Sequence, residues 1–165
     1  GLHIPPAPNR LHQDLEAAFE MWLRMPCAPT TGGRVFHQIN VASPGQWPND
    51  YRISDLVMLR PERFSIDRNE FFEGGPDVVV EIASPGDEAR DKLDFYCDVG
   101  CREIWIIERD NRAAEIYTAS PGPTPLIMSD EGWLHGPASD VQLKAVGGGL
   151  RLRLASDVST EHQVF

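Results

Sequence analysis

The sequence has few cysteines and no long apolar segment. Its 165 residues contain three cysteines, Cys27, Cys97 and Cys101, and this odd, sparse set does not suit a disulfide framework. No apolar run approaches the ~20 residues that cross a bilayer. The first ten residues lack the basic and apolar regions of a signal peptide. We therefore expect reduced thiols, no membrane partner and a cytoplasmic location.

Positive charge is also scarce. Fifteen Lys and Arg residues against 25 Asp and Glu residues give a formal net charge of −10, which argues against broad non-specific binding to nucleic acid. Only two of the cations are lysines, Lys92 and Lys144. Arg60, Arg63 and Arg68 are the nearest approach to a basic patch. They could meet phosphates, or they could pair with the acids beside them in the sequence.

Helical periodicity appears once near the start of the chain. Apolar residues recur from Leu11 at helical spacing and include Leu15, Phe19 and Trp22, and Pro26 is expected to end the pattern. A second helix is expected over residues 84–99. Ser84 would cap it, with Asp87 three residues on, and Gly100 suits the residue just past its end.

Strand patterns surround this second helix. Apolar runs predict strands at residues 34–40, 52–59, 78–82, 103–108 and 115–117. The order α-β-β-β-α-β predicts an α/β fold with a central mixed sheet. Residues 1–165 would form one domain with its core at about 11–118. Additional antiparallel strands are expected over about 119–154, followed by a tail at 155–165.

Two carboxylates interrupt otherwise apolar strands. Asp55 lies in RISDLVML and Glu81 in VVVEIA, and a buried ionised carboxylate is costly unless it is paired or binds a metal. If the two strands are neighbours in matching register, the side chains would lie ~5 Å apart. That spacing suits joint binding of Mg²⁺ or Mn²⁺. The alternative is that each acid pairs with an arginine near a strand end.

These residues carry a family resemblance. The pattern RISDLVML…GGPDVVVEIASPGDEARDKLDFYCDVGCREIWII, over about residues 50–118, resembles the PD-(D/E)xK nuclease superfamily. More closely, it is similar to the bacterial Uma-type putative restriction endonuclease family. The resemblance implies a restriction-endonuclease-like α/β core and a divalent-metal site. By motif match, Asp55 takes the first acidic position, Glu81 the second, and Lys92 the lysine position.

The chain departs from the family pattern at two positions. Ser54 stands where the family usually has proline before the first acid, and Ala83 stands where the plain (D/E)xK pattern has lysine. In this group the lysine is thought to have moved to the following helix, which makes Lys92 the substitute. The literal Pro-Asp pair ending in Asp77 is a decoy. Asp77 and Glu81 are four residues apart on one strand, ~13 Å, too far to share an ion.

Other polar residues have weaker claims. Glu16 on the first helix could supply a third acid, as in some relatives, although a solvated helix flank is the favoured interpretation. Tyr96 follows Lys92 by one helical turn and could steady it, but a core aromatic is favoured. The five histidines are scattered along the sequence, and His37 on a strand is expected to be structural.

The sequence thus predicts a Mg²⁺- or Mn²⁺-dependent endonuclease that hydrolyses DNA phosphodiester bonds. Asp55 and Glu81 would bind the metal, and Lys92 would orient water or stabilise charge on the phosphate. A homodimer is expected by analogy, because cutting both strands needs two sites. Two alternatives stay open, since fold alone does not decide function. One is a catalytically inactive binding or assembly module, and the other is a metal-dependent hydrolase of a small phosphoester.

Overall fold

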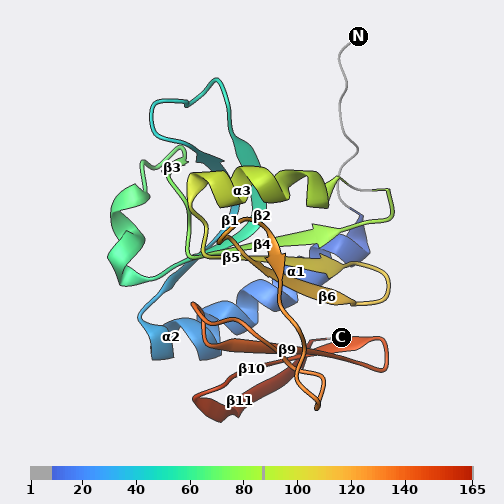
Figure 1. The fold of residues 1–165 in the computed structure, drawn as a ribbon. Coiled ribbons are helices and arrows are strands. Elements are labelled where there is room, and N and C mark those ends of the chain that lie inside the picture. The colour runs from blue at the N-terminus through green and yellow to red at the C-terminus, as the bar shows by residue number, and fades with distance from the viewer. Residues whose placement is uncertain (1–8, 87, 165) are drawn as a thin grey trace.

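The fold is a mixed α/β arrangement of two sheets with a helix between them (Figure 1). The computed structural model describes residues 9–86 and 88–164. Its helical segments are α1 (Arg10–Trp22), a π-helical segment (Leu23–Cys27), α2 (Ala28–Thr31), two 3₁₀ segments (Pro61–Ile66 and Ala89–Lys92) and α3 (Leu93–Val99). None of the described helices is long and apolar enough to cross a membrane.

The central sheet has the strand order β3-β1-β2-β4-β5-β6-β7. Its strands are β1 (Arg34–Ala42), β2 (Arg52–Leu59), β3 (Phe72–Glu73), β4 (Val78–Ala83), β5 (Glu103–Glu108), β6 (Ala114–Thr118) and β7 (Thr124–Pro125). Strands β4 and β5 pair in parallel through the connection that carries α3, and β2 pairs antiparallel with β4. Every residue of β4 is buried, because helices cover both faces of the sheet. The predicted α-β-β-β-α-β order and mixed sheet are confirmed.

The C-terminal residues form a second, antiparallel sheet. Its order is β11-β10-β9-β8, with β8 (Leu134–His135), β9 (Val141–Val146), β10 (Gly149–Leu154) and β11 (Asp157–Val164). The expected tail at 155–165 is wrong for the described residues 157–164, which form β11. Trp22 of α1 donates a hydrogen bond to the Thr160 carbonyl at 3.1 Å, and Val164 is buried. Most side chains of β11 are exposed, so the strand has no apolar run to mark it.

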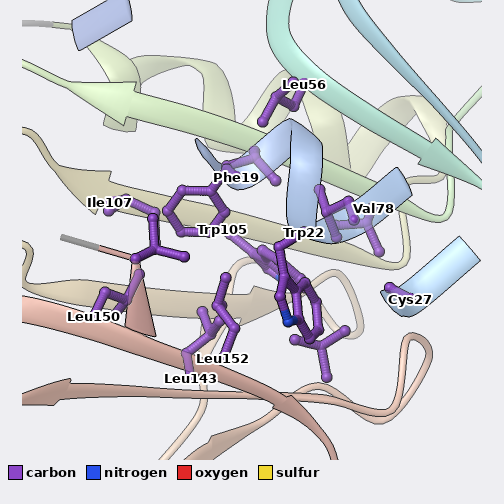
Figure 2. Packing of buried hydrophobic residues seen from close by; sticks show 14 of the residues in the cluster. Phe19, Trp22, Cys27, Leu56, Val78, Trp105, Ile107, Leu143, Leu150 and Leu152 are labelled. Carbon is purple, nitrogen blue, oxygen red and sulfur yellow. The ribbon is translucent and has the colours of Figure 1, made fainter. Parts of the chain in front are cut away.

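Two apolar cores lie on opposite faces of the central sheet. Figure 2 shows the first, in which Phe19 and Trp22 of α1 approach Trp105 of β5, with Leu150 and Leu152 of the second sheet opposite. The second core lies under α3, whose inward residues are Leu93 and Tyr96. Helices α1 and α3 therefore cover opposite faces of β2 and β4, and their polar side chains approach these strands from opposite sides.

The first helical region continues beyond Pro26, contrary to expectation. Residues Leu23–Cys27 widen into a π-helical turn, and the Ala28 amide donates to the Leu23 carbonyl. Proline has no amide hydrogen to donate and crowds the preceding turn of an α-helix. The wider turn accommodates both effects and lets the chain remain helical to Thr31.

The second helix begins later than expected. Residues 85–86 form a turn, Ala89–Lys92 form a 3₁₀ segment, and α3 covers Leu93–Val99. Ser84 is therefore not the N-cap of α3, and Asp87 lies outside the described residues. Gly100 ends the helix in the left-handed conformation, with φ 96°, as predicted. Lys92 consequently sits at the boundary between the 3₁₀ segment and α3.

A buried carboxylate away from the predicted site joins the two sheets. Glu103 of β5 is fully buried. Its Oε1 accepts hydrogen bonds from the Ala138 and Ser139 amides, and its Oε2 accepts from Trp105 Nε1 and Ser139 Oγ. Four donors offset the cost of burying this charge. Gly136 must lack a side chain here, since a Cβ would lie 2.4 Å from the Glu103 carboxylate.

Candidate metal and catalytic centre

Strands β1 and β2 share a local break that controls which side chains face α1. Gln38 has φ 53°, a left-handed conformation that is uncommon for residues with a Cβ. The pairs His37–Leu56 and Ile39–Ser54 flank this point, and Gln38 and Asp55 are left between them. Two consecutive residues of each strand therefore face α1, which strict alternation would not allow. Asp55 is brought to the α1 face in this way.

Four polar side chains meet at the break and form a closed ring. His12 Nε2 lies 3.4 Å from Glu16 Oε2 and 3.5 Å from Asp55 Oδ1. Gln38 Nε2 donates to Glu16 Oε1 at 3.1 Å and to Asp55 Oδ1 at 3.4 Å. His12 and Glu16 are one turn apart on α1, so they point the same way.

The chemistry of this ring fits a divalent cation. One ligand atom from each of His12, Glu16 and Asp55 lies within 4.8 Å of the others. Two carboxylates and an imidazole suit Mn²⁺, and the carboxylate oxygens also suit Mg²⁺. The pKa of Glu16 is raised above its usual value. Burial is the main cause, the Gln38 hydrogen bond opposes it, and the nearby Asp55 charge adds to the rise. A bound cation would offset the cost of burying the Glu16 charge and the repulsion between Glu16 and Asp55.

Asp55 also holds β2 and β4 together at this level. Its Oδ2 accepts a hydrogen bond from the Ile82 amide at 2.8 Å. The side chain thus continues the β2–β4 pairing, which in the backbone ends at Leu56–Val80. This contact fixes the carboxylate, so that its other oxygen points into the ring.

Glu81 lies next to Ile82 but faces the α3 side. It is 3% exposed. Tyr96 donates to its Oε1 at 2.6 Å, and Lys92 Nζ lies 3.3 Å from its Oε2. Burial raises the pKa of Glu81 to about 7, against the Lys92 charge, which lowers it, while Asp55 adds to the rise. Glu81 is therefore a carboxyl that can exchange a proton near neutral pH.

Ser54 completes the environment of Glu81. Its hydroxyl is fully buried and lies 2.9 Å from the Tyr96 hydroxyl. Lys92 donates to the Ile53 carbonyl at 3.1 Å as well as to Glu81. Ser54, which stands where the family pattern has proline, is thus hydrogen-bonded to Tyr96, and Tyr96 in turn donates to Glu81.

The structure sorts the predicted site residues into two adjoining groups. Asp55 joins Glu16 on the α1 face, and Glu81 joins Lys92 on the α3 face. The Asp55–Ile82 hydrogen bond connects the groups. The favoured interpretation of Glu16 as a solvated flank is wrong, since only 13% of its side chain is exposed. Tyr96 is both a buried core aromatic and a partner of Glu81.

Sequence reasoning missed two members of the ring, His12 and Gln38. The spacing of His12 and Glu16, four residues apart on a predicted helix, was the available signal for the first. No sequence pattern marked Gln38, because its role depends on a left-handed backbone that glycine or asparagine would ordinarily signal. His37 also faces α1, and its Nδ1 lies 2.9 Å from Glu20 Oε1, outside the ring.

The ring opens on a hollow of about 400 Å³ on the α1 side. Its lining residues are Gln13, Glu16, Ala17, Glu20, His37 and Gln38. Water and ions can therefore reach Glu16 and Gln38 without opening the apolar core.

The connection that carries Arg60, Arg63 and Arg68 does not adjoin this centre. Asp55 is near the start of β2, whereas Arg60 follows its end. Arg63 donates to the carbonyls of Gly75 and Gly100 at 2.6 and 2.7 Å, and the Arg60 amide donates to buried Asp77 at 2.6 Å. Arg60 lies 4.0 Å from Glu62, which agrees with the pairing alternative. Arg63 and Arg68 pair instead with Asp77 at 3.7 Å and with Glu73 at 3.6 Å. Asp77, the decoy acid, belongs to this junction.

Fold and site together define a mixed α/β protein with an acidic centre at the junction of α1, β1, β2 and β4. The sequence matches the Uma2 family, described as putative restriction endonucleases, over residues 2–138. The chain belongs to this family. It is also similar to the solved structure of a putative nuclease belonging to DUF820 from Anabaena variabilis ATCC 29413. That similarity has a TM-score of 0.59 and 16% identity, and covers 73% of this chain and 69% of the other. No curated protein matches the chain.

Proposed function

We propose that this protein is a divalent-metal-dependent endonuclease that hydrolyses DNA phosphodiester bonds. The observation that carries the proposal is the convergence of three members of the ring, His12, Glu16 and Asp55, whose ligand atoms lie within 4.8 Å of one another. The hydrogen bond from the Ile82 amide to Asp55 connects it to the pair of buried Glu81 and half-buried Lys92. Membership of a restriction endonuclease family supports this chemistry. A Mg²⁺ or Mn²⁺ ion in such a centre would lower the pKa of bound water and stabilise phosphate charge.

The protein side chains have separate roles in this proposal. Asp55 and Glu16 supply negative charge for the ion, and His12 supplies a nitrogen ligand. Lys92, held by the Ile53 carbonyl and Glu81, orients the attacking water or stabilises charge that develops on the phosphate. Glu81, whose pKa burial raises to about 7, can accept a proton from that water near neutral pH.

Two arrangements of the ion share Asp55. In the first, His12, Glu16 and Asp55 bind it; in the second, which the family pattern implies, Asp55 and Glu81 bind it. The short distances within the ring favour the first. Calorimetric titration with Mn²⁺ separates them, because Glu16→Gln should weaken binding only in the first and Glu81→Gln only in the second. Asp55→Asn should weaken binding in both.

Lys92 provides the test of catalysis. Lys92→Ala and Lys92→Arg should both lose plasmid nicking by about two to four orders of magnitude, the usual range for a catalytic proton or charge contact. Mn²⁺ affinity should stay at the wild-type value, because Lys92 is not a ligand. The arginine variant is the sharper one, since it keeps the charge but not the compact ammonium. Full nicking activity in Lys92→Arg would reduce Lys92 to a simple ion pair.

The second candidate is a catalytically inactive binding or assembly module. Ala83 in the usual lysine position and the net charge of −10 favour it. Such a module would show Mn²⁺ binding or DNA binding without nicking. A homodimer would serve the endonuclease by supplying two centres, and light scattering with and without DNA measures it.

A further inference from the structure

Gln38 occupies the place in the ring where a cation would be expected. Its Nε2 lies 3.1 Å from Glu16 Oε1 and 3.4 Å from Asp55 Oδ1. Two carboxylates thus share a single amide donor. A cation bound by both carboxylates would lie between them, as this donor does.

The backbone, rather than the surface environment, determines where this side chain points. With φ 53° at Gln38, the side chain faces α1 together with that of His37, and Ile39 turns to the α3 side. Gln38 is also exposed and lines the hollow beside Glu16. Its amide can therefore rotate without any repacking of the apolar core.

A primary amide can serve both states of such a centre. Its nitrogen is a donor and its oxygen an acceptor, and a half-turn of the amide exchanges their positions. Amide carbonyl oxygens are established ligands of hard divalent cations. The same side chain can satisfy the carboxylates when they are alone and bind the ion when it is present.

We propose that Gln38 is a further metal ligand of the centre. In the metal-free protein its nitrogen bridges Glu16 and Asp55, and its carbonyl oxygen turns to the ion on binding. The inference rests on the proposed function, because it requires that the ring binds a divalent cation. If Gln38 only donated hydrogen bonds to Glu16 and Asp55, an ion would have to displace it. Removal of the Gln38 amide would then strengthen Mn²⁺ binding.

The experiment is calorimetric titration of the full chain with Mn²⁺, using matched variants at Gln38 and Gln13. Gln13 lines the same hollow but lies outside the ring. Gln38→Leu should weaken Mn²⁺ binding about 10- to 100-fold, the range seen when groups that support a metal site are removed. Gln13→Leu should leave the affinity unchanged.

Glutamate at each position gives an independent measurement if Gln38→Leu does not fold. Gln38→Glu should lower the melting temperature in EDTA, because three carboxylates then meet, and should show a larger rise with Mn²⁺ than wild type. Gln13→Glu adds the same charge to the hollow and should change both values much less. Equal effects of the two glutamates would overturn the proposal.

The failure of this inference differs from failure of the proposed function. Unchanged or tighter Mn²⁺ binding in Gln38→Leu, with normal binding in wild type, would overturn the role of Gln38 and leave the endonuclease proposal standing. A wild-type chain that binds no Mn²⁺ at millimolar concentration would overturn both.

Discussion

At the scale of single residues, Glu81 shows how one environment serves several ends. It is buried among apolar strands, yet Tyr96 and Lys92 both reach its carboxylate. Those partners offset part of the cost of burial but not all of it, so the pKa of Glu81 is raised to about 7. Burial therefore dominates over the ion pair at this position. Glu81 is therefore costly when charged, and carboxyls with strongly perturbed pKa values cluster at functional sites.

Glu81→Gln should stabilise the metal-free protein at alkaline pH. A raised carboxyl pKa means that the folded state holds a proton between pH 4.5 and about 7 that the unfolded state has lost. Wild-type stability should therefore fall as pH rises through this window, by at most roughly 3 to 4 kcal/mol at roughly 1.4 kcal/mol per pKa unit. The variant should lack this fall, because glutamine carries no charge. Its oxygen can still accept the hydrogen bond from Tyr96, whereas its nitrogen cannot accept the one from Lys92.

Urea unfolding in EDTA at about pH 5 and about pH 8 measures this difference. Asp110→Asn is the matched control, since Asp110 is an exposed acid whose side chain pairs with the neighbouring Arg109. A wild-type free energy of unfolding that rises across the window, or that falls equally in Glu81→Gln, would contradict the assignment.

At the scale of elements, the sequence predicts those helices and strands that a regular pattern of apolar residues marks. The buried runs of β4 and β5 predict central strands because both faces of the sheet are covered. The stripe through Leu15, Phe19 and Trp22 likewise predicts α1. Asp55, Glu81 and Lys92 could be selected because a lone charge in an apolar strand is conspicuous, and because the residues matched a family pattern.

The remaining features depend on backbone detail that this pattern does not carry. The break at Gln38 puts Asp55 on the α1 face and so brings His12 and Glu16 into the site. Glutamine is not a residue type that indicates a left-handed backbone, so the sequence does not predict this break. Strand β11 escaped prediction for another reason: it is an edge strand with mostly exposed side chains, and its polar sequence resembles a tail.

Removal of β11 should be far more damaging than its exposed side chains suggest. A chain ending at Ser156 would uncover the buried strand β10 and leave Trp22 without its carbonyl partner. Newly exposed apolar surface costs ~25 cal/mol per Å², so loss of cooperative unfolding is expected, measured by calorimetry. Val158→Ser, at a 61% exposed position on the same strand, should be nearly neutral. A sharp unfolding transition in the shortened chain would show that β11 is dispensable.

At the scale of the whole molecule, charge limits how DNA can be bound. The net charge of −10 opposes a polyanion, and contacts within the chain occupy Arg60 and Arg63. A divalent ion in the ring of His12, Glu16 and Asp55 would remove part of the local negative charge. It would also give a phosphate its point of attachment. In the proposed function, metal binding would therefore be the step on which both substrate binding and chemistry depend.

Calorimetric titration of the wild-type chain and of Asp55→Asn with Mn²⁺ tests this account most directly. Asp55 contacts the ring through one oxygen and the Ile82 amide through the other. Asparagine keeps the shape of the side chain while removing its charge. We expect saturable binding by wild type, strongly weakened binding by the variant, and plasmid nicking only where the metal binds. Absence of binding by wild type at millimolar Mn²⁺, or equal binding by Asp55→Asn, would contradict the account.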